Sequence, residues 1–183
     1  MKKLTAIVLS LLLTLSIVSA MAGGTTFTTK YFTLELPEGW ESDFSDLQHD
    51  EAEKLEDLGY FYVAEGKGLF VDAYVQFDEE MKDLALWNSD ADDLKEYAEA
   101  LMEGFEEDNP VYLATIKAND IPFVLIKGAG KDGEYLHANT VSNGYFICFD
   151  VCAIDEDDAV LPLTDEYIEE FKTILATFKP VTA

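Results

Sequence analysis

The sequence contains no arginine: all 12 basic residues are lysines, and 37 aspartates and glutamates outnumber them. The formal net charge at pH 7 is therefore -25. Nucleic acids and anionic membrane surfaces are bound through basic patches, and bidentate clamps on phosphate or carboxylate groups use the planar arginine fork. The composition argues against all of these partners. We interpret the acidity as a means of keeping the protein soluble, and we favour this over a specific cationic partner.

The sequence also lacks the motifs of common catalytic and binding sites. It has no GxSxG elbow, no HExxH, no Walker loop, no CxxC and no EF-hand pattern. We expect the acidic run Asp155–Asp158 to be a solvated loop that binds Ca²⁺ weakly at most. His49 lies in a charged segment and is interpreted as inert. We therefore assign no catalytic residue, no metal ligand and no cofactor, and the lack of motifs favours a protein that is not an enzyme.

The first residues have the three-part organisation of a secretory signal peptide. Lys2 and Lys3 form a short positive region, residues 4–18 are mostly apolar, and small residues that fit a cleavage site follow. An uncleaved anchor is the alternative, but the apolar run is shorter than a membrane span. We predict a signal peptide over 1–22, no membrane attachment after cleavage, and a protein secreted to the cell envelope or the extracellular space.

The rest of the chain, 25–183, is predicted to be one globular domain. Hydrophobic residues make up 49% of the sequence and aromatic residues 13%, which is too apolar for a disordered chain. A chain of 183 residues can bury one substantial hydrophobic core. No internal repeat or low-complexity linker divides it.

The strongest structural signal is the dipeptide Asn143–Gly144 between two runs typical of strands. Asn-Gly favours a two-residue type I′ hairpin turn, because both central residues need φ > 0. This turn fixes the pairing outward from Ser142 opposite Tyr145 to Tyr135 opposite Cys152. Successive side chains alternate between the two faces of a strand, which predicts one core face and one mixed face. The core face carries Leu136, Ala138, Thr140, Ile147, Phe149 and Val151, and the mixed face carries Tyr135, His137, Asn139, Val141, Phe146, Cys148, Asp150 and Cys152.

Apolar periodicity predicts the other elements. Ser89 and Asp92 resemble a capping box at the start of the clearest helix. Thr164 is expected to cap the last helix and Pro180 to end it. The predicted strands are Tyr31–Leu36, Tyr60–Ala64, Leu69–Phe77 and Val111–Lys117, and the predicted helices are 46–58, 89–107 and the segment after Thr164.

The order of strand, hairpin, helix, four-stranded meander and terminal helix resembles the PsbP-like fold. The start FTLELPEGW is similar to the opening pattern of bacterial members, and the later segments NDIPFVLIKG, VSNGYFICF and LTDEYIEEFKTILATF fall where that family has its closing strands and helix. The resemblance spans Thr26–Phe178. It implies an α+β fold, an antiparallel sheet of about six or seven strands with helices packed on its faces. Better-known relatives bind protein partners, but no functional motif of the family transfers to this chain.

His137 and Asp150 form the one candidate site, because the Asn143–Gly144 turn places them directly opposite on the mixed face. A cross-strand pair has Cβ atoms roughly 5 Å apart, within reach of an ion pair that raises the pKa of the imidazole. Cys148 and Cys152 share this face, so a thiol-dependent or metal-binding constellation is one interpretation. We favour a structural polar pair, because the spacing supplies no oxyanion hole and no further metal ligand. The two cysteines lie about 13 Å apart along one strand, too far for a disulfide.

Two functions of different classes remain. The first is a non-enzymatic binding or accessory module that engages a protein or an envelope component through a sheet face or a loop. The second is a thiol- or metal-dependent protein that uses His137, Asp150, Cys148 and Cys152. The PsbP-like resemblance and the lack of motifs favour the first.

Overall fold

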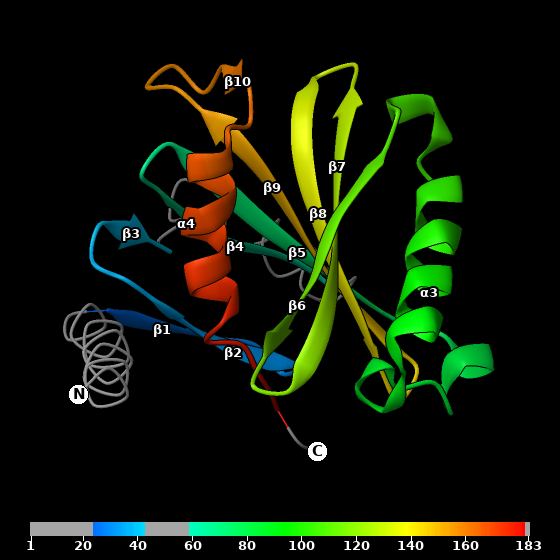
Figure 1. Ribbon diagram of the computed structural model, residues 1–183. Coiled ribbons are helices and arrows are strands. Elements are labelled where there is room, and N and C mark those ends of the chain that lie inside the picture. The colour runs from blue at the N-terminus through cyan, green and yellow to red at the C-terminus, as the bar shows by residue number, and fades with distance from the viewer. Residues whose placement is uncertain (1–23, 43–58, 182–183) are drawn as a thin grey trace, which may run out of the picture.

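The computed structural model describes residues 24–42 and 59–181. The predicted signal peptide 1–22, the predicted helix 46–58 and His49 lie outside these described residues (Figure 1). None of the helices within the described ranges is long and apolar enough to cross a membrane.

Two antiparallel sheets and two packed α-helices make up the described fold, which confirms the predicted α+β class (Figure 1). The strands are β1 (Thr25–Thr28), β2 (Phe32–Leu36), β3 (Trp40–Glu41), β4 (Tyr60–Gly66), β5 (Leu69–Phe77), β6 (Val111–Ala118), β7 (Ile121–Gly130), β8 (Gly133–Ser142), β9 (Tyr145–Ile154), β10 (Val160–Leu161) and β11 (Lys179–Pro180). The larger sheet has eight strands in the order β3-β4-β5-β9-β8-β7-β6, with β10 paired to the end of β9. The smaller sheet has the order β1-β2-β11.

The hairpin of β8 and β9 has the register that the Asn-Gly turn predicts. The backbone φ is 51° at Asn143 and 83° at Gly144, as a type I′ turn requires. The ladder runs outward from the turn to Leu136 opposite Val151. On its other side β9 pairs with β5 over the whole length of that strand, so β9 lies in the interior of the sheet.

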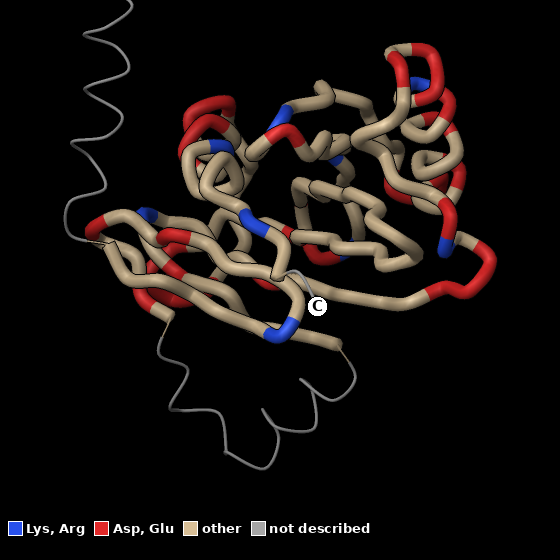
Figure 2. The backbone as a smooth tube through the Cα atoms, turned by 90° about the horizontal axis from the view of Figure 1, so that it is seen from below, with Lys and Arg blue, Asp and Glu red and all other residues tan. Residues whose placement is uncertain are grey.

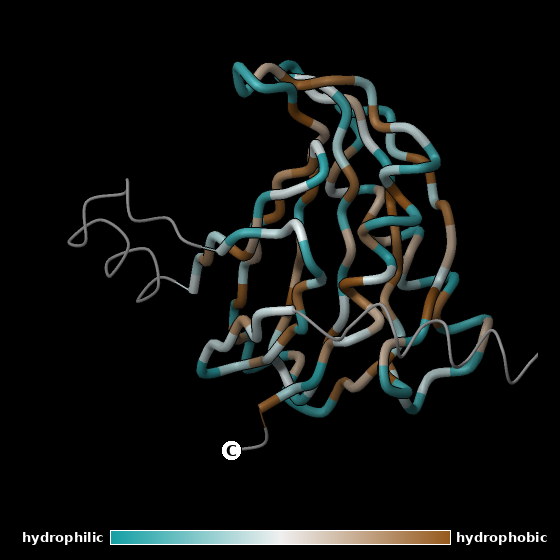
Figure 3. The backbone as a smooth tube through the Cα atoms, turned by 90° about the vertical axis from the view of Figure 1, so that its left-hand side faces the viewer, coloured by the Kyte–Doolittle hydropathy of each residue, from teal (hydrophilic) through white to brown (hydrophobic). Residues whose placement is uncertain are grey.

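The core lies between the larger sheet, the smaller sheet and the helix α4 (Asp165–Leu175) (Figure 1). The ring of Phe149 on β9 is surrounded by other phenylalanines, with centroid distances of 5.2 Å to Phe32 and 6.1 Å to Phe178. Hydrophobic residues recur along the strands that supply this core (brown in Figure 3). All the residues predicted for the core face of the β8–β9 hairpin are buried. The fully buried phenylalanines are Phe32, Phe123, Phe149, Phe171 and Phe178.

The helix predicted from Ser89 begins later than expected. The observed helix, α3, covers Ala91–Glu103, and its N-cap is Asp90. The Asp90 carboxylate accepts hydrogen bonds from the N–H groups of Asp92 and Asp93, and the Asp93 carboxylate accepts from the N–H of Asp90. The predicted Ser89–Asp92 capping box is therefore wrong by one residue. Ser89 instead follows the short 3-10 turn η2 (Leu86–Asn88) that precedes the helix, and its N–H donates to the carbonyl oxygen of Leu86 at 3.0 Å.

α3 also ends before the predicted Glu107. The N–H of Gly104 closes its last turn, and a separate 3-10 turn η3 (Glu106–Asp108) follows. Asn109 then adopts the left-handed conformation, with φ 50°. A glycine lowers helix propensity and a left-handed residue cannot continue an α-helix, so the chain turns into β6 here.

The last helix begins after Thr164 as predicted, although the Thr164 side chain makes no capping hydrogen bond. It ends at Leu175, before the predicted stop at Pro180. The hydroxyl of Thr177 accepts a hydrogen bond from the N–H of Glu35 at 2.8 Å. Pro180 then pairs with Phe32 in the smaller sheet. Contacts with β2 therefore determine where this helix ends, and the sequence pattern around Pro180 does not.

Candidate functional site

The mixed face of the larger sheet carries three ionisable side chains in one row across adjacent strands. His137 on β8 pairs with Asp150 on β9, as predicted, and Asp150 pairs on its other side with Asp72 on β5. Cys148 and Cys152 lie two residues to either side of Asp150 and share its face. Sequence reasoning missed Asp72, because β5 and β9 are far apart in the chain and no turn signal links them.

The His137 side chain is buried and bound to Asp150. Its Nδ1 lies 2.7 Å from Asp150 Oδ1, and only 6% of the residue is exposed. The ring of Phe105, just beyond α3, covers it at a centroid distance of 4.9 Å. Burial opposes the imidazolium, but hydrogen bonds to Asp150 and Cys148 and the attraction of their charges outweigh it and raise the pKa of His137 to about 10. The imidazole is therefore protonated at neutral pH and cannot serve there as a general base toward a substrate.

Cys148 is held by a chain of hydrogen bonds that links the sheet to α3. The Asn139 Nδ2 donates to Cys148 Sγ at 2.7 Å, and the Tyr97 hydroxyl of α3 donates to Asn139 Oδ1. Asn139 is 1% exposed and Cys148 is 9% exposed. Burial and the neighbouring Cys148 raise the pKa of Tyr97, so the phenol stays neutral and remains a donor. Both polar atoms of the Asn139 side chain are thus used inside the protein.

Asp72 extends the polar row away from α3. The Tyr60 hydroxyl on β4 donates a hydrogen bond to Asp72 Oδ2. Burial raises the pKa of Asp72 to about 6; the bond from Tyr60 lowers it, and the like charge of Asp150 across the strands raises it further. Burial and the bond to Asp72 in turn raise the pKa of Tyr60. Asp72 is therefore bound by a phenol hydroxyl, whereas the neighbouring Asp150 is bound by His137.

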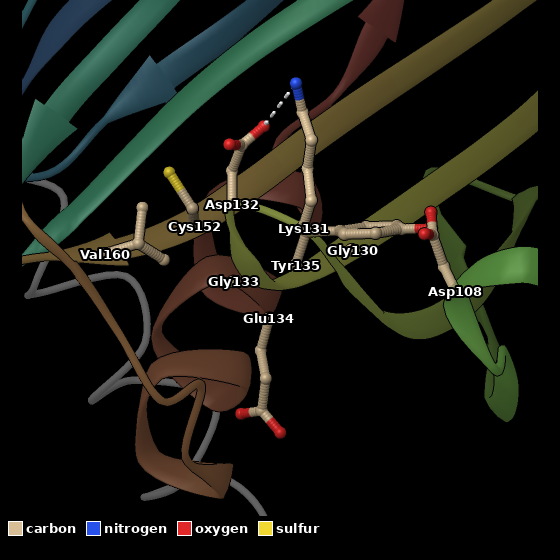
Figure 4. Close-up of a pocket in the computed structure, with 9 residues that line it drawn as sticks. All are labelled: Asp108, Gly130, Lys131, Asp132, Gly133, Glu134, Tyr135, Cys152 and Val160. Carbon is tan, nitrogen blue, oxygen red and sulfur yellow. Dashed lines mark hydrogen bonds and ion pairs between the residues drawn. The ribbon is translucent and has the colours of Figure 1, made fainter.

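Cys152 lies apart from this network, in the wall of a pocket of about 420 Å³. The predicted Tyr135–Cys152 pair is not part of the ladder, which ends at the pair before it, but both residues line the pocket (Figure 4). Burial, together with the charges of Asp72 and Asp150, raises the pKa of Cys152, so its thiolate is scarce at neutral pH. The lining residues are Asp108, Gly130, Lys131, Asp132, Gly133, Glu134, Tyr135, Cys152 and Val160.

The Tyr135 ring closes the end of the pocket nearest η3. Its hydroxyl donates to Asp108 Oδ2 at 2.8 Å (Figure 4). The ring lies against Gly128 on β7, where an added Cβ would approach it to 2.5 Å. Gly128 is therefore required for close approach of the ring, and Asp108 orients its hydroxyl. The Glu134 side chain extends from the pocket wall toward α4 (Figure 4), and its Oε2 lies 3.0 Å from Nζ of Lys127 on β7.

The acidic loop Asp155–Asp158 forms its own hydrogen bonds. Asp155 Oδ1 accepts from the N–H of Asp157 at 2.9 Å and from the N–H of Ala159 at 3.0 Å. One carboxylate of the run is thereby used to shape the turn. Within residues 24–42 and 59–181, no group of three or more His, Cys, Asp or Glu side chains is arranged to hold a metal ion.

Comparison with known proteins bears on the fold. No protein-family model matches this chain, and no curated protein matches it. Among solved structures, it is similar to the solution structure of cyanobacterial PsbP (CyanoP) from Synechocystis sp. PCC 6803, with 15% sequence identity and a TM-score of 0.46. The similarity covers 88% of this chain and 94% of that chain. The similarity implies nothing about the activity or the partners of this chain.

Proposed function

We propose that this protein is an exported, acidic, non-enzymatic binding or accessory module that engages a protein or an envelope component. The observation that carries the proposal is that the polar groups of the mixed face, apart from Cys152, are bonded to other groups of the protein. His137 is bound to Asp150, and Cys148 to Asn139. A reaction centre needs a nucleophile and a base that face space for a substrate. Neither His137 nor Cys148 lines the pocket beside Cys152.

The exposed surface supports binding. Large apolar side chains are exposed in several places on the described surface, and exposed apolar groups are typical of interaction sites where they gather. Most lysines of the described surface lie beside a carboxylate. Acidic residues lie on several sides of the molecule (red in Figure 2). Anionic partners are therefore disfavoured. The exposed large apolar residues are Tyr74, Phe77, Met81, Trp87, Val111, Tyr112, Leu113, Tyr145, Val160 and Val181.

A capture experiment on the producing cells tests the proposal. Tagged protein would be cross-linked to its neighbours in the envelope and medium, in parallel with a doubly substituted His137→Gln, Cys148→Ser variant. We expect both proteins to capture the same partner, because binding does not use the buried network. A folded double variant that loses the partner would contradict a purely structural role of the buried network.

Export is tested by the intact mass of the protein recovered from the medium or the envelope, which should correspond to a chain beginning near Met21 or Gly23.

A thiol-dependent or metal-dependent function is the second candidate, favoured by the contact of His137 with both Asp150 and Cys148. Its test is the alkylation rate of each cysteine by iodoacetamide at neutral pH, together with metal analysis of protein purified without chelator. We expect slow alkylation in the folded protein and no stoichiometric zinc. Fast alkylation of Cys148 that disappears in His137→Ala, or one zinc per chain, would favour this candidate over the binding module.

A further inference from the structure

One edge of the larger sheet is formed by β6. Within the described residues, β6 pairs with β7 on one side and with no strand on the other. An edge strand presents backbone N–H and C=O groups that can pair with an extended segment of another chain. The first three residues of β6 are apolar and exposed: Val111 is 56%, Tyr112 40% and Leu113 38% exposed. This end of the edge therefore offers hydrogen-bonding groups and apolar contact surface together.

The apolar residues lie on both faces of the edge. Val111 is opposite Lys127 and Tyr112 is opposite Ile126, so their side chains point to opposite sides of the sheet. The Tyr112 hydroxyl lies 3.0 Å from the hydroxyl of Thr115, which holds the ring along the strand. An added strand would therefore meet an apolar group on each face.

The far end of β6 is less suited to pairing. Lys117 is exposed there, and an edge lysine opposes pairing with another strand. The bulge at Leu113, where the register with β7 shifts, lies at the other end of the strand, inside the exposed apolar segment. Docking is therefore expected over residues 111–116.

Charge determines the kind of partner. Glu103, Glu106 and Glu107 are exposed just before β6, and the whole chain carries -25. A second copy of this chain would bring like charge to the same edge, which disfavours self-pairing. A segment that carries lysine or arginine is electrostatically complementary to it.

We propose that the outer edge of β6 over residues 111–116 binds an extended, cationic segment of a partner protein, which adds to the sheet as a further strand. The proposal rests on the proposed binding function and names its site and the chemistry of the partner. Backbone hydrogen bonds hold the segment, and its alternating side chains determine specificity. Apolar side chains of the segment contact Val111 and Tyr112, and its basic side chains face Glu106 and Glu107.

The probe is a short synthetic peptide of alternating lysine and valine. Two matched peptides accompany it: one of alternating glutamate and valine, and one lysine-valine peptide whose alternate amides are methylated so that it cannot form a ladder. We expect only the first to bind the full protein in fluorescence anisotropy, with binding weakened by salt. Amide hydrogen exchange should slow at residues 111–116 when it binds.

Substitutions of exposed apolar residues locate the site. A doubly substituted Val111→Lys, Leu113→Lys variant should bind the peptide about tenfold more weakly, because it adds charge and removes apolar contact. The control is Met81→Lys, since Met81 is 37% exposed and lies outside β6, in the 3-10 turn Glu79–Met81. It should bind as the unmodified protein does.

Several results would overturn the proposal: no binding of the lysine-valine peptide, equal binding of the glutamate peptide, equal binding by the two-lysine variant, or protection outside β6. A dimer of this chain that the two-lysine variant abolishes would also overturn it, since a second copy would then occupy the edge. The proposed function is judged separately by partner capture. Capture that survives in the two-lysine variant refutes this site and leaves the binding module standing.

Discussion

Neighbouring residues of β9 lie in opposite environments. The Phe149 side chain enters the core, where it is fully buried among other phenylalanine rings. Cys148 and Asp150, on either side of it in the chain, point to the opposite face, where Asn139 and His137 bind them. The core face is held by apolar burial, which has no preferred direction. The mixed face is held by a few directional hydrogen bonds between specific side-chain atoms.

This difference determines how each face responds to change. A core responds to lost volume, and its contribution hardly depends on pH. A buried polar network responds to the loss of a single partner and to protonation, because an unpaired buried group is costly. Substitutions on the two faces of β9 should therefore differ in both size and pH dependence.

The largest effect is expected for Phe149→Ala. Removing a fully buried phenylalanine leaves a cavity among rings that cannot collapse, and should cost about 3–5 kcal/mol of the free energy of unfolding. The control is Phe77→Ala, because Phe77 is 48% exposed. It should cost less than about 1 kcal/mol. Urea unfolding measures both, and similar losses in the two variants would contradict the packing of the core.

Asp150→Asn should have the next largest effect, and one that depends on pH. The folded pKa of His137, about 10, lies above its usual 6.5, so the folded state holds the proton more tightly. The stabilisation is fully present below about pH 6.5 and is lost as the pH rises through the folded pKa. The variant should lose about 1–2 kcal/mol near pH 6, after allowance for the partly exposed carboxylate. The loss should shrink toward pH 10.

A matched control for this pH profile is Asp132→Asn. Asp132 lies 3.8 Å from Lys131, and both side chains are almost fully exposed. Exposed pairs contribute little, so urea unfolding should show no measurable change at any of these pH values. A pH-independent loss in Asp150→Asn would show that His137 is not charged in the folded protein.

Asp72→Asn should stabilise the protein at neutral pH. Burial raises the folded pKa of Asp72 from 3.8 to about 6, so the folded state holds this proton more tightly than the unfolded state. Stability therefore falls as the pH rises between these values, and the cost persists above them. The amide keeps an acceptor for Tyr60 without the charge, and a gain of about 1 kcal/mol is expected at pH 7 and none below about pH 4. Thermal unfolding across this range would reveal a loss at neutral pH if the interpretation is wrong.

The last effect, similar in size to that of Asp72→Asn, concerns α3, the helix that covers the mixed face. Asp90→Ala removes the N-cap acceptor of two backbone N–H groups and should cost about 1 kcal/mol. Ser89→Ala should cost nothing measurable, because Ser89 makes no cap to this helix. Equal losses of the free energy of unfolding in the two variants would show that Ser89 caps the helix, as the sequence suggests.

Local signals predicted the parts of the fold that depend on neighbouring residues. The Asn143–Gly144 turn and the alternation beside it were sufficient for the register of β8 and β9, and hence for the pairing of His137 with Asp150. The cap at Ser89 and the stop at Pro180 were wrong for a common reason. The first depends on a preceding 3-10 turn, and the second on pairing with β2, and neither is visible in the local pattern.

By itself, the sequence determined the acidic charge, the α+β class and the His137–Asp150 pair, because composition, alternation and a two-residue turn act over short stretches of chain. Only the tertiary structure decided what surrounds that pair. The pairing of β5 with β9 places Asp72 beside Asp150. Tyr97 on α3, which is 42 residues before Asn139 in the chain, donates a hydrogen bond to it. Contacts between such distant residues follow from how the sheet and α3 pack together, and no periodicity in the chain records which side chains then meet.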